Sequence, residues 1–318
     1  MKHHNRKKYR IPANVIFLNI FYSLQRIEKG EIMKILFCTD GSKISFNALR
    51  NFAGWQNEAI VDVICVIDWT FLPDEVSIEE DGFANSCANV ADTILNYAEK
   101  EIKSLNMNLG RKIKHCGSAI DSILEQLKTE YYDLVLLGSH GKKGLQKWLG
   151  SVSQEIVNSS KDSSYITKDA NNKERILFTT DGSPYSYEVV RQAINHLHLY
   201  DKKIYICTVN EDPDLLFLEG TLDTNWLLEI EKQQNIFAAK AVKTIESILE
   251  ENDLKSIESA ILSGNPTQKI LDFAKAREID LIVIGERKKS KMDNFLTGSI
   301  SRRVLENTRS DVLIIKES

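Results

Sequence analysis

Short apolar runs alternate along this chain with longer segments in which apolar residues recur every three or four positions. The runs 35–38 and 134–137 are apolar at every position, which is typical of strands in a parallel sheet that is covered on both faces. Spacings such as Ile120, Ile123 and Leu127 put apolar residues on one face of a helix. The alternation of strand and helix predicts an open, mostly parallel α/β sheet.

The same pattern locates the elements along the chain. Strands are expected at the runs 35–38, 60–67, 112–116, 134–137, 165–167, 204–209, 260–262, 281–284 and 312–315. Helices are expected at 85–105, 119–127, 151–158 and 224–249, and further helices are expected to begin at Ser42, Ser183, Pro266 and Ser299. The run 112–116 is short and polar, which places it near an edge of the sheet.

The chain contains the same strand-and-loop pattern twice. The stretch 34–42 aligns with 175–183 at an offset of 141 residues, and Asp133-Leu134 aligns with Asp280-Leu281 at an offset of 147. Such self-similarity is the signature of an internal repeat. The sequence therefore predicts a duplicated domain.

Domain boundaries follow from this duplication. The first domain is predicted at 33–168, a short polar linker at 169–173 and the second domain at 174–318. The segment 1–32 fits neither repeat: a basic start precedes an apolar stretch, as in a signal peptide, but no small-residue cleavage site follows. We interpret it as a dispensable extension or an unused upstream start, with Met33 as the initiator and a membrane-surface anchor as the alternative.

Composition narrows the class of protein. With 318 residues, of which 42% are hydrophobic and 27% charged, the chain has the composition of a globular protein whose two domains can each bury a core. A formal net charge of −4 provides no overall basic field, which argues against nucleic acid as a partner. No apolar run reaches the roughly 18 residues that a membrane span needs.

The five cysteines show no CxxC spacing. Cys38, Cys65 and Cys207 lie inside strand patterns, where a buried free thiol is the common explanation. An odd number of cysteines without a framework spacing favours a reducing compartment. We therefore expect a cytoplasmic protein.

Two strand patterns end abruptly at a glycine that opens a loop. Gly138 follows the run 134–137, and after the loop Gly150-Ser151 begins a helical pattern. In the second repeat, Gly285 and Gly298-Ser299 stand in the same order. Glycine lets a ligand approach the backbone, and the free N–H groups of a helix N-terminus attract anions. The pattern indicates an anion site, with an ordinary strand-to-helix turn as the alternative.

These motifs resemble those of a known family. The start M-K-I-L-F-x-T-D-G-S, the G-S-H-G loop and the G-S-[VI]-S helix opening look like the universal stress proteins, in a tandem form that covers 33–318. The resemblance implies two Rossmann-like domains of the adenine nucleotide alpha hydrolase-like type, each an open five-stranded sheet with helices on both faces. It also implies binding of ATP or AMP, with Mg²⁺ if ATP is bound, and a role in stress response and signalling.

Nucleotide-binding members of that family place G-x2-G-x9-G-[ST] around the phosphates, an aspartate near the ribose and the end of the second strand against the adenine. Carried over to repeat one, the resemblance implies as nucleotide-binding residues Asp40, Val66, Gly138, Gly141, Gly150, Ser151 and Val152. In repeat two it implies Asp181, Val209, Gly285, Gly298, Ser299 and Ile300.

Both repeats depart from the family motif. In repeat one, eight residues separate Gly141 from Gly150 where the family has nine, which would move the N–H groups of the helix start. In repeat two the spacing is kept, but Lys288 replaces the second glycine. A positive φ would be strained for lysine, and its side chain could obstruct a phosphate. We expect at least one of the two repeats to bind nucleotide.

Family members pair through their last strands, and the resemblance implies that the two repeats do so within one chain, as a pseudo-dimer. The last strand of repeat one, 163–167, is polar for a central strand, so we expect a weaker contact than usual. A homodimer of the whole chain and an unknown protein partner both stay open.

The sequence lacks three motifs that are typical of enzymes. The sequence has no G-x4-G-K-[ST], no H-x-G-H and no G-x-S-x-G. His140 lies in the glycine loop without an identifiable nucleophile or orienting acid, and His196 and His198, two residues apart, make a poor metal pair. We therefore expect no catalytic residue and no metal site, with a nucleotide-free scaffold or a slow ATPase as alternatives.

Overall fold

In the computed structural model, the described residues are 32–68, 80–139, 149–168, 172–211, 224–286 and 299–317. Repeat one comprises β1 (Met33–Thr39), α2 (Lys43–Ala53), β2 (Ala59–Ile67), α3 (Glu80–Ser104), β3 (Asn108–Cys116), α4 (Ala119–Thr129), β4 (Leu134–Gly138), α5 (Ser151–Ser159) and β5 (Ser164–Thr167). Repeat two comprises β6 (Arg175–Thr180), α6 (Pro184–His196), β7 (Lys203–Asn210), α7 (Thr224–Glu250), β8 (Ile257–Ser263), α8 (Pro266–Ala276), β9 (Leu281–Glu286), α9 (Ser299–Asn307) and β10 (Asp311–Lys316). The prediction of tandem α/β domains is confirmed.

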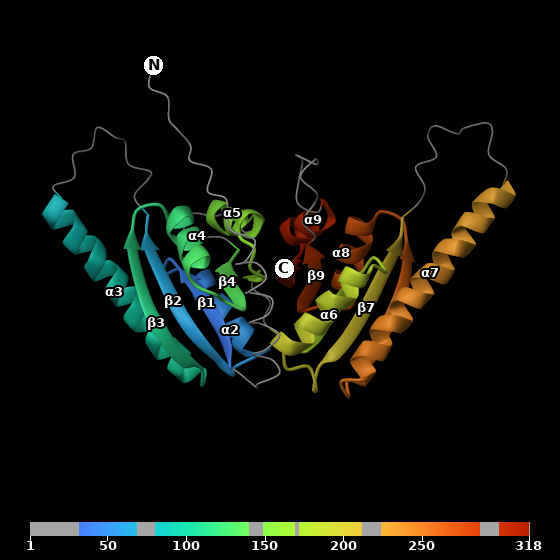
Figure 1. Cartoon of the computed structure of the whole chain (residues 1–318), viewed down its shortest axis with the longest axis horizontal. Coiled ribbons are helices and arrows are strands. Elements are labelled where there is room, and N and C mark those ends of the chain that lie inside the picture. Colours follow the sequence, from blue (N-terminus) through green and yellow to red (C-terminus); the bar gives the residue numbers. More distant parts are fainter. Residues whose placement is uncertain are drawn as a thin grey trace, which may run out of the picture.

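The strands of the described residues form one continuous sheet in the order β3-β2-β1-β4-β5-β10-β9-β6-β7-β8. Strands pair in parallel within each repeat, and β5 pairs antiparallel with β10, with Tyr165 opposite Leu313. Figure 1 shows two half-sheets that spread from a shared centre, with β3 and β8 at the outer edges. The last strands of the two repeats therefore pair within one chain.

Helices cover both faces of the sheet. Side chains of a strand alternate between the two faces, and both faces of this sheet are apolar and are buried by helices. Ile35 and Phe37 of β1 pack in a core with residues of α2, α3, α6 and α7. Leu36 and Cys38 face the other way and pack with residues of α4, α5, α8 and α9. In Figure 1, α3 and α7 lie along the outer sides of the half-sheets, and the second helix layer lies between the half-sheets. No helix in the described ranges is both long and apolar enough to cross a membrane.

The polar strand β5 lies near the centre of the sheet, and all four of its residues are buried. The buried carboxylate of Asp311 in β10 accepts hydrogen bonds from four groups of repeat one: the hydroxyls of Tyr165 (2.6 Å) and Thr167 (3.0 Å), the N–H of Lys168 (2.7 Å) and the side-chain amide of Asn51 (3.2 Å). We expected a weaker contact here because 163–167 is polar, but its buried polar groups have hydrogen-bond partners across the junction, and buried polar groups are tolerated when their hydrogen bonds are made.

A second buried polar contact joins the repeats at the other end of β10. The ammonium group of Lys316 donates hydrogen bonds to the backbone carbonyls of Val157 and Ser160 in repeat one, the latter at 2.7 Å. It also lies 3.6 Å from the carboxylate of Glu286 in β9. Because α5 ends at Ser159, this cation lies at the negative end of the helix. The end of α5 is thereby tied to the carboxyl end of β9.

The cysteines follow the prediction in part. Cys38, Cys65 and Cys207 are free and buried in strands, as predicted. Cys87 in α3 and Cys116 at the end of β3 form a disulfide bond. Their spacing in the sequence carried no sign of this pairing, because the pairing depends on how α3 packs against β3.

Candidate functional site

The carboxyl ends of three neighbouring strands bring the predicted residues of repeat one to one edge of the sheet. Because β1 lies between β2 and β4, the strand ends at Asp40, Val66 and Gly138 are neighbours along this edge. Thr39 lies opposite Cys65, so Asp40 and Val66 each follow a paired position. Ligands of open α/β sheets bind outside such strand ends.

The turn after β1 is held by its own side chains. The N–H of Gly41, at φ 78°, donates to the hydroxyl of Thr39 at 3.1 Å, and this hydroxyl lies 2.8 Å from that of Ser45. The carboxylate of Asp40 accepts the N–H of Ser42 at 2.9 Å, and Ser42 caps α2. A carboxylate at this position is therefore held in place at the edge of the sheet.

The turn after β6 in repeat two makes the same hydrogen bonds as the turn after β1. Gly182, at φ 73°, donates to Thr180 at 3.0 Å, the hydroxyl of Thr180 lies 2.8 Å from that of Ser186, and Asp181 accepts the N–H of Ser183 at 3.0 Å. The strand order also places Asp181, at the end of β6, between β7 and β9, whose last residues but one are Val209 and Gly285. The sequence motif T-D-G-S thus encodes one turn used twice, and the threonine and the later serine were missed as parts of it.

Gly138 and Gly285 have a packing role. A Cβ atom on Gly138 would lie 3.1–3.2 Å from backbone atoms of Ile44 and Ser45 in α2. A Cβ atom on Gly285 would lie 2.7 Å from Val189 and 2.8 Å from Tyr185 in α6. Glycine at these strand ends therefore allows a helix to pack closely, a role that the sequence analysis did not foresee.

Helix α5 begins next to the end of β4. Its N-cap residue, Gly150, has no side chain to accept from the first turn, so the first N–H groups of α5 lack a capping side chain. The hydroxyl of Ser153 donates to the carbonyl of Gly138 at 2.6 Å, and the N–H of Gly150 donates to the carbonyl of Ser139. These two bonds hold the N-terminus of α5 against the sheet edge.

The first turns of α5 and α9 hold the remaining described site residues. Ser151 is exposed at the start of α5, and Val152 is partly buried against the core below it. In repeat two, Ser299 begins α9 and the side chain of Ile300 is exposed. Each repeat therefore starts a helix where the resemblance implies phosphate contacts.

The end of β9 differs from the end of β4 in one charged residue. Glu286 follows Gly285 where repeat one has Ser139 after Gly138, at the offset of 147. Burial raises the pKa of Glu286, and the ammonium group of Lys316 opposes part of that rise. Since Gly285 faces α6, side-chain alternation turns Glu286 toward the opposite face, where α9 lies. The offset between the repeats would have revealed this acidic residue, which our sequence reasoning missed.

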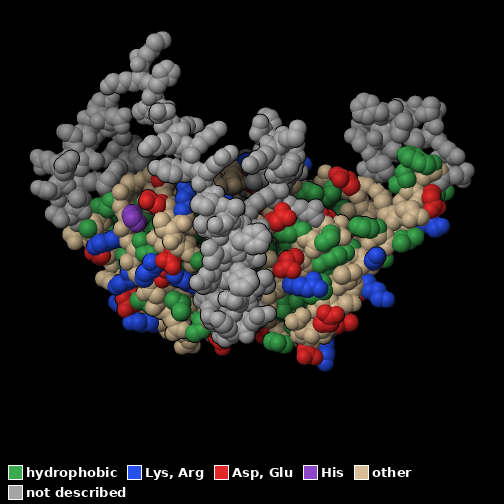
Figure 2. Space-filling model, in the orientation of Figure 1, with side chains coloured by type: hydrophobic (Ala, Val, Ile, Leu, Met, Phe, Trp, Pro, Cys, Tyr) green, Lys and Arg blue, Asp and Glu red, His purple; other side chains and the backbone are tan. Residues whose placement is uncertain are grey.

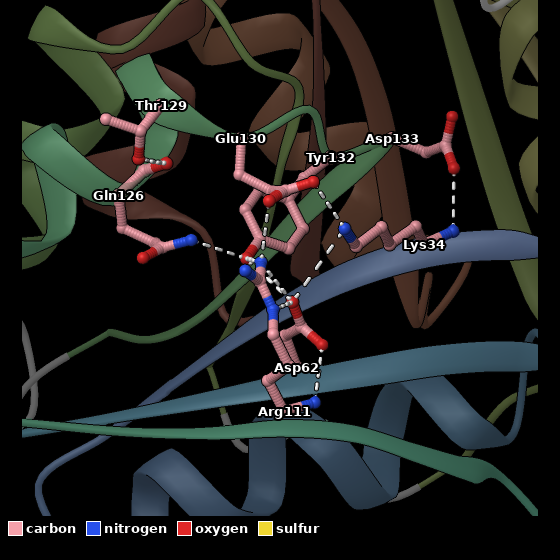
Figure 3. A network of polar contacts seen from close by, with 8 residues as sticks. All are labelled: Lys34, Asp62, Arg111, Gln126, Thr129, Glu130, Tyr132 and Asp133. Carbon is pink, nitrogen blue, oxygen red and sulfur yellow. Dashed lines mark hydrogen bonds and ion pairs between the residues drawn. The ribbon is translucent and has the colours of Figure 1, made fainter.

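A polar network inside repeat one was also missed, and Figure 3 shows it from close by. Asp62 of β2 is buried and accepts hydrogen bonds from the backbone (2.7 Å) and the guanidinium (2.9 Å) of Arg111 and from the hydroxyl of Tyr132 (2.9 Å). Lys34 lies 3.9 Å from Asp62 and 2.8 Å from Glu130. Lys34 of β1 lies opposite Ile60 of β2, near the amino ends of both strands. The network therefore stabilises the end of the sheet opposite the candidate site.

The electrostatics of this network follow from its contacts. Burial acts to raise the pKa of Asp62, but the hydrogen bonds from Arg111 and Tyr132 outweigh it, and the pKa is lowered. Burial and the neighbouring Asp62 both raise the pKa of Tyr132. The carboxylate is therefore ionised and the phenol neutral near pH 7, which suits a structural role for the network.

Parts of both glycine loops lie outside the described residues, namely His140, Gly141, Lys288 and Gly298. Their predicted roles stay predictions. Within the described ranges, no group of three or more His, Cys, Asp and Glu side chains is placed to hold a metal ion.

Known proteins resemble this chain over almost its whole length. The profile of the universal stress protein family matches it twice, over residues 31–167 and 173–316. A universal stress protein of Methanocaldococcus jannaschii is 30% identical over 154 residues, which cover 48% of this chain and 88% of that protein. One of Synechocystis is 22% identical over 311 residues, which cover 89% of this chain and 99% of that protein.

The fold is also found among solved structures. A universal stress protein of Archaeoglobus fulgidus superposes with a TM-score of 0.66 at 21% identity, and the match covers 90% of this chain and 98% of that one. At this identity the likeness concerns the fold alone. Together with the double family match and the duplicated turn, it leads to one conclusion: the chain belongs to the universal stress protein family, as a member with two tandem domains.

Proposed function

We propose that this protein binds an adenine nucleotide, ATP or AMP, at the carboxyl edge of repeat one, and that it acts in stress response and signalling. The nucleotide serves as a ligand that sets the conformation and is not turned over. The observation that carries this proposal is the start of α5, where Gly150 leaves the helix without a capping side chain beside the end of β4. An anionic phosphate would accept hydrogen bonds from those N–H groups and interact favourably with the helix dipole.

The neighbouring strand ends suit the rest of the ligand. Asp40 is oriented by the N–H of Ser42 and lies at the end of the central strand β1, where a ribose hydroxyl could donate to its carboxylate. Val66, the last residue but one of the adjacent strand β2, offers backbone groups to an adenine ring, since its side chain is buried in the core. Mg²⁺ would accompany ATP and reduce the negative charge on its phosphates.

Repeat one is the better candidate because of the charge near β9. In repeat two, the carboxylate of Glu286 lies on the α9 side of the sheet, where phosphates would bind; even paired with the ammonium group of Lys316 at 3.6 Å, it is a less favourable neighbour for a phosphate than a neutral side chain. In repeat one, the neutral Ser139 stands at the corresponding position. We therefore expect one nucleotide per chain, in repeat one.

Calorimetric titration of the full-length protein with ATP–Mg²⁺ and with AMP tests the proposal, and phosphate release is followed in the same samples. The informative variant is Gly150→Asp. Gly150 has φ −65° and ψ 151°, which any L-residue can adopt, and aspartate is a good N-cap, so the fold should be kept or stabilised. Its carboxylate would occupy the N–H groups and repel phosphate, so affinity should fall at least about tenfold.

The matched control is Gly298→Asp, which changes the corresponding position of repeat two and should leave affinity and stoichiometry unchanged. Absence of binding of either nucleotide at millimolar concentration would refute the proposal and favour the nucleotide-free scaffold. Unchanged binding by Gly150→Asp would exclude α5 as the phosphate site. Release of phosphate with wild-type protein would favour the slow ATPase.

A further inference from the structure

The disulfide bond of repeat one joins a helix to an edge strand. Cys87 lies in α3 with a buried side chain, and Cys116 is the last residue of β3, where it is exposed. Their Cα atoms are 6.6 Å apart. The edge position makes the sulfur of Cys116 accessible to a small reactant, while the sulfur of Cys87 is shielded.

The bond stands beside several side-chain contacts that hold α3 on β3, among them the hydrogen bond from the ammonium group of Lys112 to the side-chain oxygen of Asn96 at 3.0 Å. Lys112 pairs with Glu99 at 2.9 Å, and Lys114 pairs with Asp92 at 2.8 Å. Both ion pairs are partly exposed, and pairs of this kind contribute little stability. The disulfide is therefore the strongest link between the helix and the edge strand.

Repeat two builds the same helix and strand without a covalent bond. At the offset of 147, Gln234 and Ser263 stand in place of Cys87 and Cys116. The turn that follows the strand is equivalent in both repeats: Gly117 has φ 130° and donates to the carbonyl of Ile67 at 3.0 Å, and Gly264 has φ 121° and donates to that of Asn210 at 3.0 Å. The fold of a repeat therefore does not depend on the bond.

The remaining cysteines are less reactive toward external thiols and disulfides than this pair. Cys38, Cys65 and Cys207 are free and buried in β1, β2 and β7. Burial raises the pKa of Cys38 and of Cys207, which keeps these thiols protonated and unreactive. Three buried thiols and a dispensable disulfide with one exposed cysteine are features of a redox-responsive protein and not those of a disulfide scaffold.

We propose that Cys87 and Cys116 are a reversible modification site that exchanges with low-molecular-weight disulfides and thiols. In the oxidising direction, the Cys116 thiolate attacks a sulfur of the external disulfide and releases one thiol, which leaves a mixed disulfide on Cys116. The Cys87 thiolate then attacks the Cys116 sulfur and releases the second thiol. Two protein thiols are oxidised, one external disulfide is reduced to two thiols, and the two protons from the protein pass to the released thiols.

The bond controls how firmly α3 and the end of β3 are held at the carboxyl edge. Cys116 pairs in register with Ile67, and the preceding pair is Val66 with His115. Reduction leaves exposed ion pairs and hydrogen bonds between α3 and β3, together with the strand ladder. We expect the amides of β3 to exchange about tenfold faster or more in the reduced protein, while those of β8 are unchanged.

To test this site, the native full-length protein is equilibrated in glutathione buffers of different redox potential. Each sample is quenched with acid and alkylated, and the state of each cysteine is then determined by mass spectrometry. We expect Cys87 and Cys116 to change state together in one transition, while the three strand cysteines stay unmodified until the protein is denatured. Hydrogen exchange of β3 against β8 is measured on the same samples. Neither measurement involves nucleotide, so the result is independent of the proposed function.

Two single variants separate the roles of the sulfurs. Cys87→Ser leaves the exposed Cys116, which should form a mixed disulfide with glutathione, whereas Cys116→Ser leaves the buried Cys87, which should not react. The double serine variant should fold, as repeat two does. A bond that stays intact at every poise, or whose reduction unfolds repeat one, would be structural and would overturn the proposal. Failure of the two cysteines to pair in oxidising buffer would overturn it as well.

Discussion

The hydroxyl of Tyr165 in repeat one donates a hydrogen bond of 2.6 Å to the carboxylate of Asp311 in repeat two, across the antiparallel junction of β5 and β10. Both residues are completely buried. The bond thus joins two halves of the molecule at the centre of its sheet. It also explains why a strand of serine, tyrosine and threonine can lie there.

Tyr165→Phe removes this donor from a buried carboxylate. We expect the free energy of unfolding to fall by about 1–2 kcal/mol, because a buried acceptor loses a charge-assisted hydrogen bond. Urea denaturation at pH 7 measures the change. Tyr200→Phe is the matched control, since Tyr200 is 80% exposed and its change should have almost no effect. Equal losses for the two variants would contradict a special role for the junction.

Asp62→Asn tests the polar network of repeat one. The pKa of Asp62 is lowered in the folded protein, so its ionised form stabilises the fold above the pKa of the unfolded chain, and this contribution is lost as the pH falls through the folded value. We expect a loss of about 2 kcal/mol at pH 7 that shrinks on acidification, measured by urea denaturation across acidic and neutral pH. Asp92→Asn, at the exposed pair with Lys114, should change little at any pH.

Lys316→Met leaves the buried Glu286 without its cation. Burial already raises the pKa of Glu286 and Lys316 opposes it, so the pKa should rise further in the variant. A raised folded pKa of an acid means that stability falls as the pH rises through it. We expect a loss of about 3 kcal/mol in alkaline buffer that becomes smaller in acid, followed by thermal unfolding.

A second substitution isolates the cause of that pH dependence. The double variant with Glu286→Gln removes the stranded carboxylate, so most of the pH dependence introduced by Lys316→Met should disappear and part of the stability should return; Asp162, whose pKa Lys316 also lowers, accounts for the remainder. If the double variant keeps the same pH dependence, another group is responsible.

Gly138→Ala and Gly285→Ala test the packing role of the strand-end glycines. The added Cβ would press on the backbone of α2 in one case and on Val189 and Tyr185 in the other. Tyr185 is itself held by hydrogen bonds to the carbonyls of Glu286 (3.1 Å) and Ile315 (2.8 Å), so it cannot move without cost. We expect each variant to lose about 1–3 kcal/mol of stability in urea denaturation.

These glycine variants also bear on the nucleotide experiment. A loss of binding in Gly138→Ala would accompany a loss of stability, whereas Gly150→Asp should lose binding while the fold is kept. If Gly138→Ala were as stable as the wild type, the close approach of α2 would not be the reason for glycine at this position.

Much of the fold could be predicted from the sequence, because burial on both faces leaves a strong local signal. The apolar runs of β1, β4 and β9 and the capped starts of α2 and α6 lie within one or two residues of their predicted positions. The edge position of β3 was also predicted correctly, although the strand begins at Asn108, four residues before the predicted start. Local pattern and capping chemistry are enough for such elements.

The sequence predicted the position of the candidate site, at the carboxyl edge of the sheet, but not the contacts within it. The strand pattern placed Asp40 and Gly138 at carboxyl ends of strands, and the resemblance added Val66; the strands that carry them are neighbours in the sheet, and their role in binding stays a prediction. The direction of Glu286 toward α9 and the packing of α2 on Gly138 could not be predicted, because each depends on a helix distant in sequence.

The sequence by itself determined that the chain is a duplicated α/β protein with the same T-D-G-S turn at the start of each half. Those features are local, so periodicity, caps and turn residues specify them. Only the tertiary structure decided that a buried Asp311 makes the polar strand β5 suitable for the centre of the sheet, and that Cys87 meets Cys116. Contacts between residues far apart in the chain depend on how the elements pack in three dimensions, and a one-dimensional pattern does not record them.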